Sequence, residues 1–145
     1  MTVRSGLERL QSEECALVRG SRVALLCHAA SVDHRLRHAA QGLAERAGAR
    51  VTRLLAPEHG VAAAEQDMVE VGETRDPISG LPVVSLYGCD ESSLAPRPEV
   101  LDDVDVVVAD LADVGARYYT FVATLVRTME VAAAAGCRVV VADRP

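Results

Sequence analysis

The chain has 145 residues, which is enough for one domain with a single core. Half of its residues are apolar, but it contains only three Tyr, one Phe and no Trp, so the core must be built from Val, Leu and Ala. A formal net charge of −6 without a basic cluster argues against nucleic-acid binding. No apolar run is long enough to cross a membrane, and the first residues lack the apolar centre of a signal peptide. We therefore expect a cytoplasmic protein whose four scattered cysteines are reduced thiols, three of them buried.

The first half of the chain predicts a β-α-β unit. After a short helical lead-in over 6–18, the apolar run Arg22–Cys27 predicts the first strand, and residues 50–55 predict the second. Between them, residues 33–47 carry apolar side chains such as Leu36 at helical spacing, with Ser31 or Asp33 as N-cap. A unit of this kind normally pairs its strands in parallel through a right-handed crossover.

The second half continues the alternation. Residues 56–80 lack periodicity, apart from one or two possible helical turns over 61–67, and a loop of that length inside a compact domain is usually functional. Short strands are predicted over 82–86, 104–109 and 138–142, with a turn or short helix ending at Leu101. A long helix over 118–135 is predicted to turn Val122, Leu125, Met129 and Ala132 inward. The chain thus predicts a single α/β domain, Rossmann-like, with a mostly parallel sheet and helices on both faces.

Polar side chains follow two of these strands, at the point where each strand ends. Glu58 and His59 come just after the second strand, in a Pro-Glu-His-Gly turn that is either suited to general acid or base chemistry or a solvated loop with an incidental charge. Asp110 ends the buried strand 104–109, and Asp113 and Arg117 follow it. In open α/β sheets ligands bind at the carboxyl ends of parallel strands, so Glu58 and Asp110 are expected at one edge. For Asp113 the pattern favours a structural role, capping the next helix and pairing with Arg117 four residues on.

Two other kinds of site find little support. His34 and His38 have metal-ligand spacing on the predicted helix, but no HExxH arrangement accompanies them, so a solvated helix face is favoured and no metal is expected. The turn after the first strand, from Cys27 to Ser31, contains no glycine, which disfavours a dinucleotide. No cofactor is therefore expected.

Five segments occur in an order that is similar to a known family. They read LAPEHG at 55–60, DPISGLP at 76–82, SLYG at 85–88, DLADVGARYYT at 110–120 and DRP at 143–145. Together they resemble the N-terminal part of the NamZ-type exo-β-N-acetylmuramidases, also catalogued as DUF1343. The resemblance covers residues 1–145 and less than half of a family member, because family proteins continue into a second domain that forms the other side of a cleft.

The resemblance implies hydrolysis of the β-1,4 bond that holds a terminal N-acetylmuramic acid of peptidoglycan. It implies catalytic roles for Glu58, His59 and Asp110. The hydrolysis can follow a retaining, an inverting or a substrate-assisted course. The residues expected to line the sugar site are His28, Asp113, Arg117, Tyr118 and Tyr119.

This chain departs from the family pattern at some positions. Cys27-His28 replace a Thr-Asn pair, Ala112 replaces a Gln, and Val61–Ala64 lacks a glycine. The alternative function is therefore a non-catalytic sugar-binding or assembly domain, inactive without a second domain. Since no second domain follows in this sequence, the expected partner is another copy or a separately encoded second domain, through 56–80 or the helix ending at Gly136.

Overall fold

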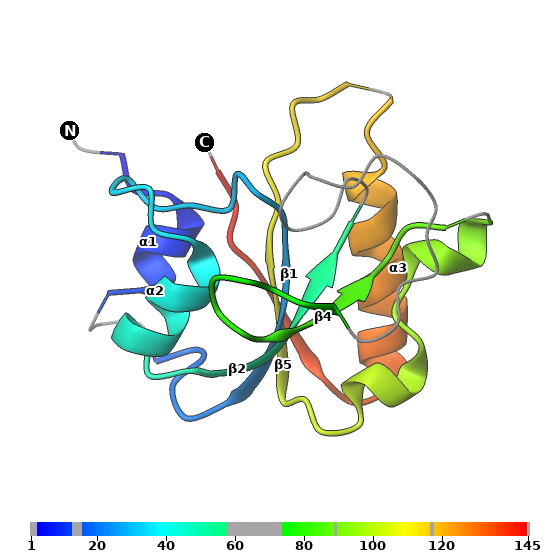
Figure 1. Cartoon of the computed structure of the whole chain (residues 1–145), viewed down its shortest axis with the longest axis horizontal. Helices are drawn as coiled ribbons and strands as arrows, with labels where there is room; N and C mark the ends of the chain where they lie inside the picture. Colours follow the sequence, from blue (N-terminus) through cyan, green and yellow to red (C-terminus); the bar gives the residue numbers. More distant parts are fainter. Residues whose placement is uncertain (1–2, 13–15, 58–73, 89, 117, 145) are drawn as a thin grey trace.

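The structure is a computed structural model that describes residues 3–12, 16–57, 74–88, 90–116 and 118–144 (Figure 1). Its centre is a six-stranded sheet with the strand order β3-β4-β2-β1-β5-β6. All neighbours pair in parallel except β3, which runs antiparallel to β4 at one edge. The strands are β1 (Arg22–Cys27), β2 (Arg50–Ala56), β3 (Thr74–Arg75), β4 (Pro82–Ser85), β5 (Val106–Asp110) and β6 (Arg138–Val141). The predicted α/β class with a mostly parallel sheet is confirmed.

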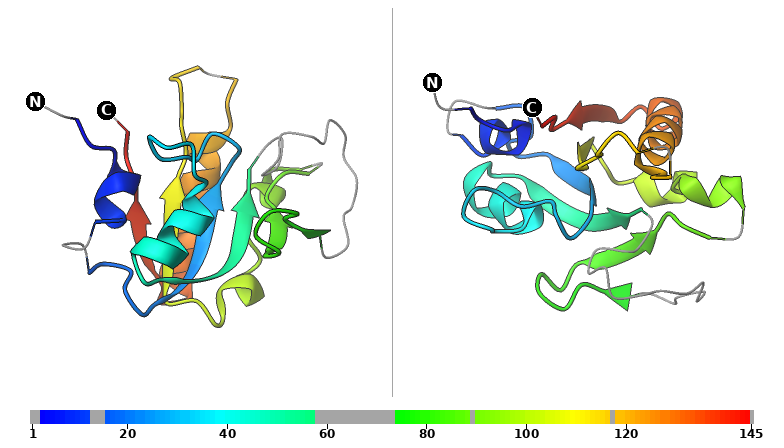
Figure 2. Two further views of the ribbon diagram at one scale, coloured as in Figure 1. Left: turned by 60° about the vertical axis from the view of Figure 1, so that its left-hand side comes forward. Right: turned by 90° about the horizontal axis from the view of Figure 1, so that it is seen from above.

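Helices cover both faces of this sheet (Figure 2). On one face lie α1 (Gly6–Leu10) and α2 (Ala39–Arg46), and on the other lie α3 (Phe121–Ala134) and the 3-10 helices η1 (Glu91–Leu94) and η2 (Pro98–Leu101). Alternate residues of β1 supply the two cores: Val23 and Leu25 face α1 and α2, whereas Ala24 and Leu26 face α3. Because both faces are covered, the central strands are continuous apolar runs.

Helix α2 begins six residues later than predicted. The Asp33 carboxylate accepts the backbone N–H groups of Arg35 and Arg37 and binds the Arg37 guanidinium at 2.7 Å, which folds this segment into a turn. Side-chain bonds of this kind compete with helix formation. Leu36 takes a positive φ of 60° and is 82% exposed, so its predicted place in the core is wrong. The N-cap is His38, rather than Ser31 or Asp33.

Helix α3 also differs from its prediction, in both its start and its buried face. It begins at Phe121, three residues later than expected, and buries Phe121, Thr124, Thr128 and Ala132. Val122 and Met129 are exposed, whereas Leu125 packs against the core as predicted. The small threonine and alanine side chains allow a close approach to the sheet, although the Thr124 and Thr128 hydroxyls have no hydrogen-bond partner.

Three further expectations concern the ends and loops. The lead-in helix is shorter than predicted, because α1 ends at Leu10 and the chain turns at 17–20 before β1. Cys27 and Cys137 are buried free thiols, as expected, while Cys15 and Cys89 lie outside the described residues. The same is true of the possible helical turns over 61–67. In the described ranges, no helix has the length and apolar content that crossing a membrane would require.

Gly6 provides a test of how α1 is seated against the C-terminal segment. Its N–H donates to the Asp143 carbonyl at 2.7 Å, and a Cβ there would come within 2.5 Å of Ala142 backbone. At a solvent-exposed position inside a helix, Ala is more stable than Gly by about 1 kcal/mol. We expect Gly6→Ala to lower the free energy of unfolding in urea by about 1–3 kcal/mol because backbone atoms must move.

The control for this test is Gly42→Ala. The three atoms nearest to a Cβ at Gly42 all belong to the end of the Gln11 side chain, which can move more easily than backbone, so the cost should be smaller. A Gly6→Ala protein as stable as the wild type would contradict the packing described.

Candidate functional site

The carboxyl ends of β2, β1 and β5 meet at one edge of the sheet, as the sequence predicts. Leu26 pairs with Leu55 and Cys27 pairs with Asp110, so the three strands end side by side. Glu58, His59 and Arg117 lie outside the described residues. The distance between the Glu58 and Asp110 carboxyl groups, and the roles expected of these residues, therefore stay predictions.

The Asp110 carboxylate is fully buried at this edge, where it pairs with Arg144. Arg144 Nε donates to Oδ1 at 3.0 Å, and Nη2 donates to Oδ1 at 2.9 Å and to Oδ2 at 3.0 Å. Burial raises the pKa of Asp110 above its usual range, while the Arg144 charge and hydrogen bonds oppose that shift. Both carboxylate oxygens are thus bound by one guanidinium.

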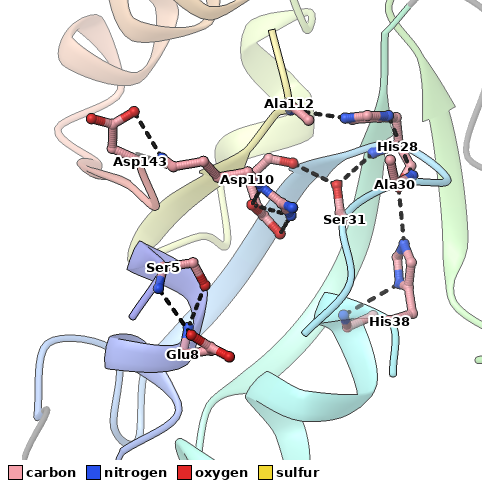
Figure 3. Close-up of polar contacts among 11 residues, drawn as sticks. Ser5, Glu8, His28, Ala30, Ser31, His38, Asp110, Ala112 and Asp143 are labelled. Atoms are coloured by element: carbon pink, nitrogen blue, oxygen red, sulfur yellow. Dashed lines mark hydrogen bonds and ion pairs between the residues drawn. The ribbon is translucent and has the colours of Figure 1, made fainter. Parts of the chain in front are cut away.

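A second set of bonds joins the turn after β1 to the end of β5 (Figure 3). The Ser31 hydroxyl donates to the Asp110 carbonyl at 2.5 Å and accepts the His28 N–H at 3.0 Å. His28 Nε2 accepts the Ala112 N–H at 2.9 Å. His28 and Ala112, two of the positions that depart from the family pattern, therefore contact each other directly.

The His28 ring is held as a neutral imidazole. Burial, the Arg144 charge and His38 all lower its pKa. The Ala30 N–H also lies 3.4 Å from Nδ1, but a neutral ring accepts at one nitrogen only. Of these two contacts, the 2.9 Å bond at Nε2 is the shorter and has the normal length of a hydrogen bond.

Aromatic side chains extend this cluster toward α3. The His28 and Phe121 rings are 5.0 Å apart, and the Tyr119 and Phe121 rings are 5.2 Å apart. Such tilted pairs fix ring orientation. Tyr119 remains 44% exposed, and Tyr118 is 92% exposed. The structure thus brings His28, Tyr119 and Asp110 to one region, with Tyr118 in solvent.

Several structural roles differ from those expected. Asp113 does not cap α3, because its Oδ1 accepts the Gly115 N–H at 2.6 Å in the loop before the helix. Thr120 is the N-cap of α3 and makes no side-chain capping bond. His34 is exposed, as expected, and pairs with Glu8 at 2.7 Å. His38 is half-buried rather than solvated, and its Nε2 donates to the His28 carbonyl at 3.3 Å.

Two residues of this cluster, Arg144 and Ser31, were not predicted as site residues from the sequence. Arg144 belongs to the DRP segment, and it follows β6, which runs parallel to β5 and ends at the same edge. That adjacency was the available signal, but it depends on knowing the strand order. Among the residues that the structure describes, no group of three or more His, Cys, Asp or Glu side chains is arranged to hold a metal ion.

Comparison with known proteins shows the family to which this fold belongs. Residues 23–145 match the model of the family described as "Exo-beta-N-acetylmuramidase NamZ, N-terminal". The chain belongs to this family. It is 36% identical over 143 residues to the peptidoglycan beta-N-acetylmuramidase NamZ of Bacillus subtilis (strain 168), covering 99% of this chain and 34% of that protein. The resemblance stated from the five sequence segments is therefore confirmed.

Two crystal structures of DUF1343 family proteins from Bacteroides fragilis NCTC 9343 share the fold. One has a TM-score of 0.83 at 34% identity, covering 98% of this chain and 34% of its own. The other has a TM-score of 0.76 at 24% identity, covering 100% of this chain and 35% of its own, and indicates the fold alone. This NamZ-family chain spans about a third of the length of these relatives.

Replacing Arg144 should show how much a buried, unpaired Asp110 carboxylate lowers the free energy of unfolding. We expect Arg144→Met to lower the free energy of unfolding by about 3–5 kcal/mol at pH 7, because it leaves a buried carboxylate unpaired. Without the guanidinium, the effect of burial on the Asp110 pKa is unopposed, so the carboxyl takes up a proton more readily as the pH falls. The loss should therefore be smaller near pH 4.5 than at pH 7 in urea titrations.

Arg138→Met is the matched control, since Arg138 is exposed and its side chain makes one contact of 3.5 Å with Ser21. It should change stability by about 0.5 kcal/mol or less at either pH. A similar, pH-independent loss in both variants would contradict the role given to the Asp110–Arg144 pair.

His28 should make the fold sensitive to mild acid. Its pKa is lowered in the folded protein, so the unfolded chain binds the proton more readily. Its contribution to stability is full above the unfolded pKa of about 6.5 and is lost as the pH falls through the lowered folded value. We expect His28→Asn to lose less stability than the wild type between pH 7 and pH 5, measured by chemical unfolding. Equal losses would mean that His28 titrates alike in both states.

Proposed function

We propose that this chain supplies the catalytic carboxylate of a peptidoglycan glycoside hydrolase that removes terminal N-acetylmuramic acid. The supporting observation is the junction of β2, β1 and β5 at one edge in a member of the NamZ family. Glu58 follows β2 by two residues in the sequence, and Asp110 ends β5. The Bacillus subtilis relative is named for hydrolysis of a β-N-acetylmuramide in peptidoglycan.

The proposed chemistry assigns Glu58 to proton transfer at the glycosidic oxygen, with His59 beside it in sequence. Cleavage then requires either a second carboxylate or the acetamido group of the sugar itself. Asp110 is proposed to act through Arg144, because both of its oxygens are bound to that guanidinium. It thus positions a cation at the edge rather than attacking the sugar.

Binding of the sugar is proposed for the polar and aromatic groups around this pair. Arg144 Nη1 bonds to none of the described residues, which leaves a donor for the lactyl carboxylate of muramic acid. Tyr119, whose ring packs against Phe121, has a partly exposed ring face that a sugar could contact. His28, Asp113, Arg117 and Tyr118 complete the proposed set of sugar-binding residues.

One observation favours a second function, a non-catalytic sugar-binding domain. The Asp110 carboxylate is buried, and both of its oxygens already accept hydrogen bonds from Arg144, which disfavours a direct role at the sugar. A domain that keeps the edge and binds muramic acid without turnover would fit this geometry. The Bacillus subtilis relative that is named for this activity is a chain about three times this length.

A chromogenic β-N-acetylmuramide separates these functions. Release of the chromophore that is abolished by Glu58→Gln supports the hydrolase. Glu99→Gln, in an exposed acid of η2, is the matched control and should keep full activity. Calorimetric binding of muramic acid without release supports the binding domain. If the folded chain neither releases the chromophore nor binds muramic acid, both proposed functions are contradicted.

A further inference from the structure

The outer edge of β6 is an open strand edge. Arg138 N–H donates to the Asp105 carbonyl at 3.2 Å and Ala142 N–H donates to the Ala109 carbonyl at 2.8 Å. Since backbone groups alternate along a strand, the N–H and C=O groups of Val139 and Val141 point away from β5. No described strand pairs with them, and β6 ends the strand order. Natural proteins usually protect such edges with charges, proline or bulges, but here three consecutive valines follow Arg138.

An apolar stripe on α3 lies next to this edge. Val122, Val126 and Met129 are 58%, 48% and 43% exposed, and their spacing places them on one flank of the helix. Arg127 lies on the opposite flank, where it pairs with Glu91 of η1. The stripe therefore faces away from η1 and toward β6. The view from above shows α3 beside β6 at the end of the sheet, with η1 and η2 on its other side (Figure 2).

The stripe also lacks charge. The two charged residues of α3, Arg127 and Glu130, pair with each other at 3.2 Å, and Glu130 borders the stripe four residues after Val126. A partner that covers the stripe would thus bury no unpaired charge of this helix. Depletion of charge and enrichment of exposed apolar side chains distinguish the centre of a protein interface from ordinary surface.

We propose that the β6–α3 surface, meaning the outer edge of Val139–Val141 with Val122, Val126 and Met129, joins two copies of this chain. The spacing of the free N–H and C=O groups fits pairing with the same strand of a second copy. A two-fold axis midway between the Val140 residues of the two copies sets Val139 opposite Val141 of the other copy, so each pair exchanges both of its N–H···O bonds.

The same axis brings the two α3 helices together on one face of a continuous sheet, stripe against stripe. A two-fold interface needs a surface that is complementary to itself. Both the β6 edge and the apolar stripe of α3 meet this requirement. The proposal does not depend on the proposed catalytic function.

Sedimentation of the full chain at micromolar concentrations tests this interface. The wild type should sediment with twice the 15.4 kDa of one chain. Val126→Glu places a charge in the stripe and should shift the dimer toward monomer by at least tenfold. Val141→Pro removes only an outward N–H, so it should block the strand pairing without losing a bond to β5.

Ala123→Glu is the control, because it adds the same charge to an exposed position on the opposite flank of α3. It should remain dimeric. Circular dichroism establishes that each variant is folded, and Val126→Glu keeps the test decisive if Val141→Pro unfolds. A monomeric wild type, or a folded stripe or edge variant that dimerises as tightly as the wild type, would overturn the proposal.

Discussion

Parallel pairing of β1 with β2 and β5 is the constraint on which the rest of this structure depends. Because β1 is buried on both faces, its register with its two neighbours is strongly specified by the core. Parallel strands that share a register also end together, so the turn after β1 and the end of β5 meet at one edge. The polar cluster exists at that edge because the backbone places it there before any side chain interacts.

Burial then decides the electrostatics of the cluster. A buried Asp110 carboxylate is costly unless a cation accompanies it, and Arg144 provides one from the segment after β6. That guanidinium also lowers the pKa of His28, which remains neutral and can accept the Ala112 N–H. One ion pair thus holds the C-terminal segment on the sheet, and its guanidinium adds to the burial that lowers the pKa of the neighbouring histidine.

The same sheet ends without protection at β6. Closing the core on both faces required α3 to lie across β5 and β6, with its small residues inward. Val122, Val126 and Met129 of α3 were thereby left on its flank, beside a strand edge with free backbone groups. The proposed β6–α3 surface thus results from the way α3 packs on the sheet and not from a separate sequence motif.

The sequence by itself determined five of the six described strands, the α/β class and the family, because apolar β-branched runs and the segments LAPEHG, DLADVGARYYT and DRP are local patterns. The short edge strand β3 lies in the segment that was expected to be a loop. It also placed Asp110 at the correct edge of the sheet, since strand ends follow from chain order. The start of α2 could not be predicted from the sequence. The Asp33 carboxylate accepts backbone N–H groups and binds the Arg37 guanidinium, which forms a turn that the helical spacing of apolar residues does not reveal. The buried face of α3 depended on how closely its threonines approach the sheet. The partner of Asp110 lies 34 residues away in the sequence, and only the tertiary structure brings Arg144 to it. A contact between distant residues depends on strand order, which a local pattern does not contain.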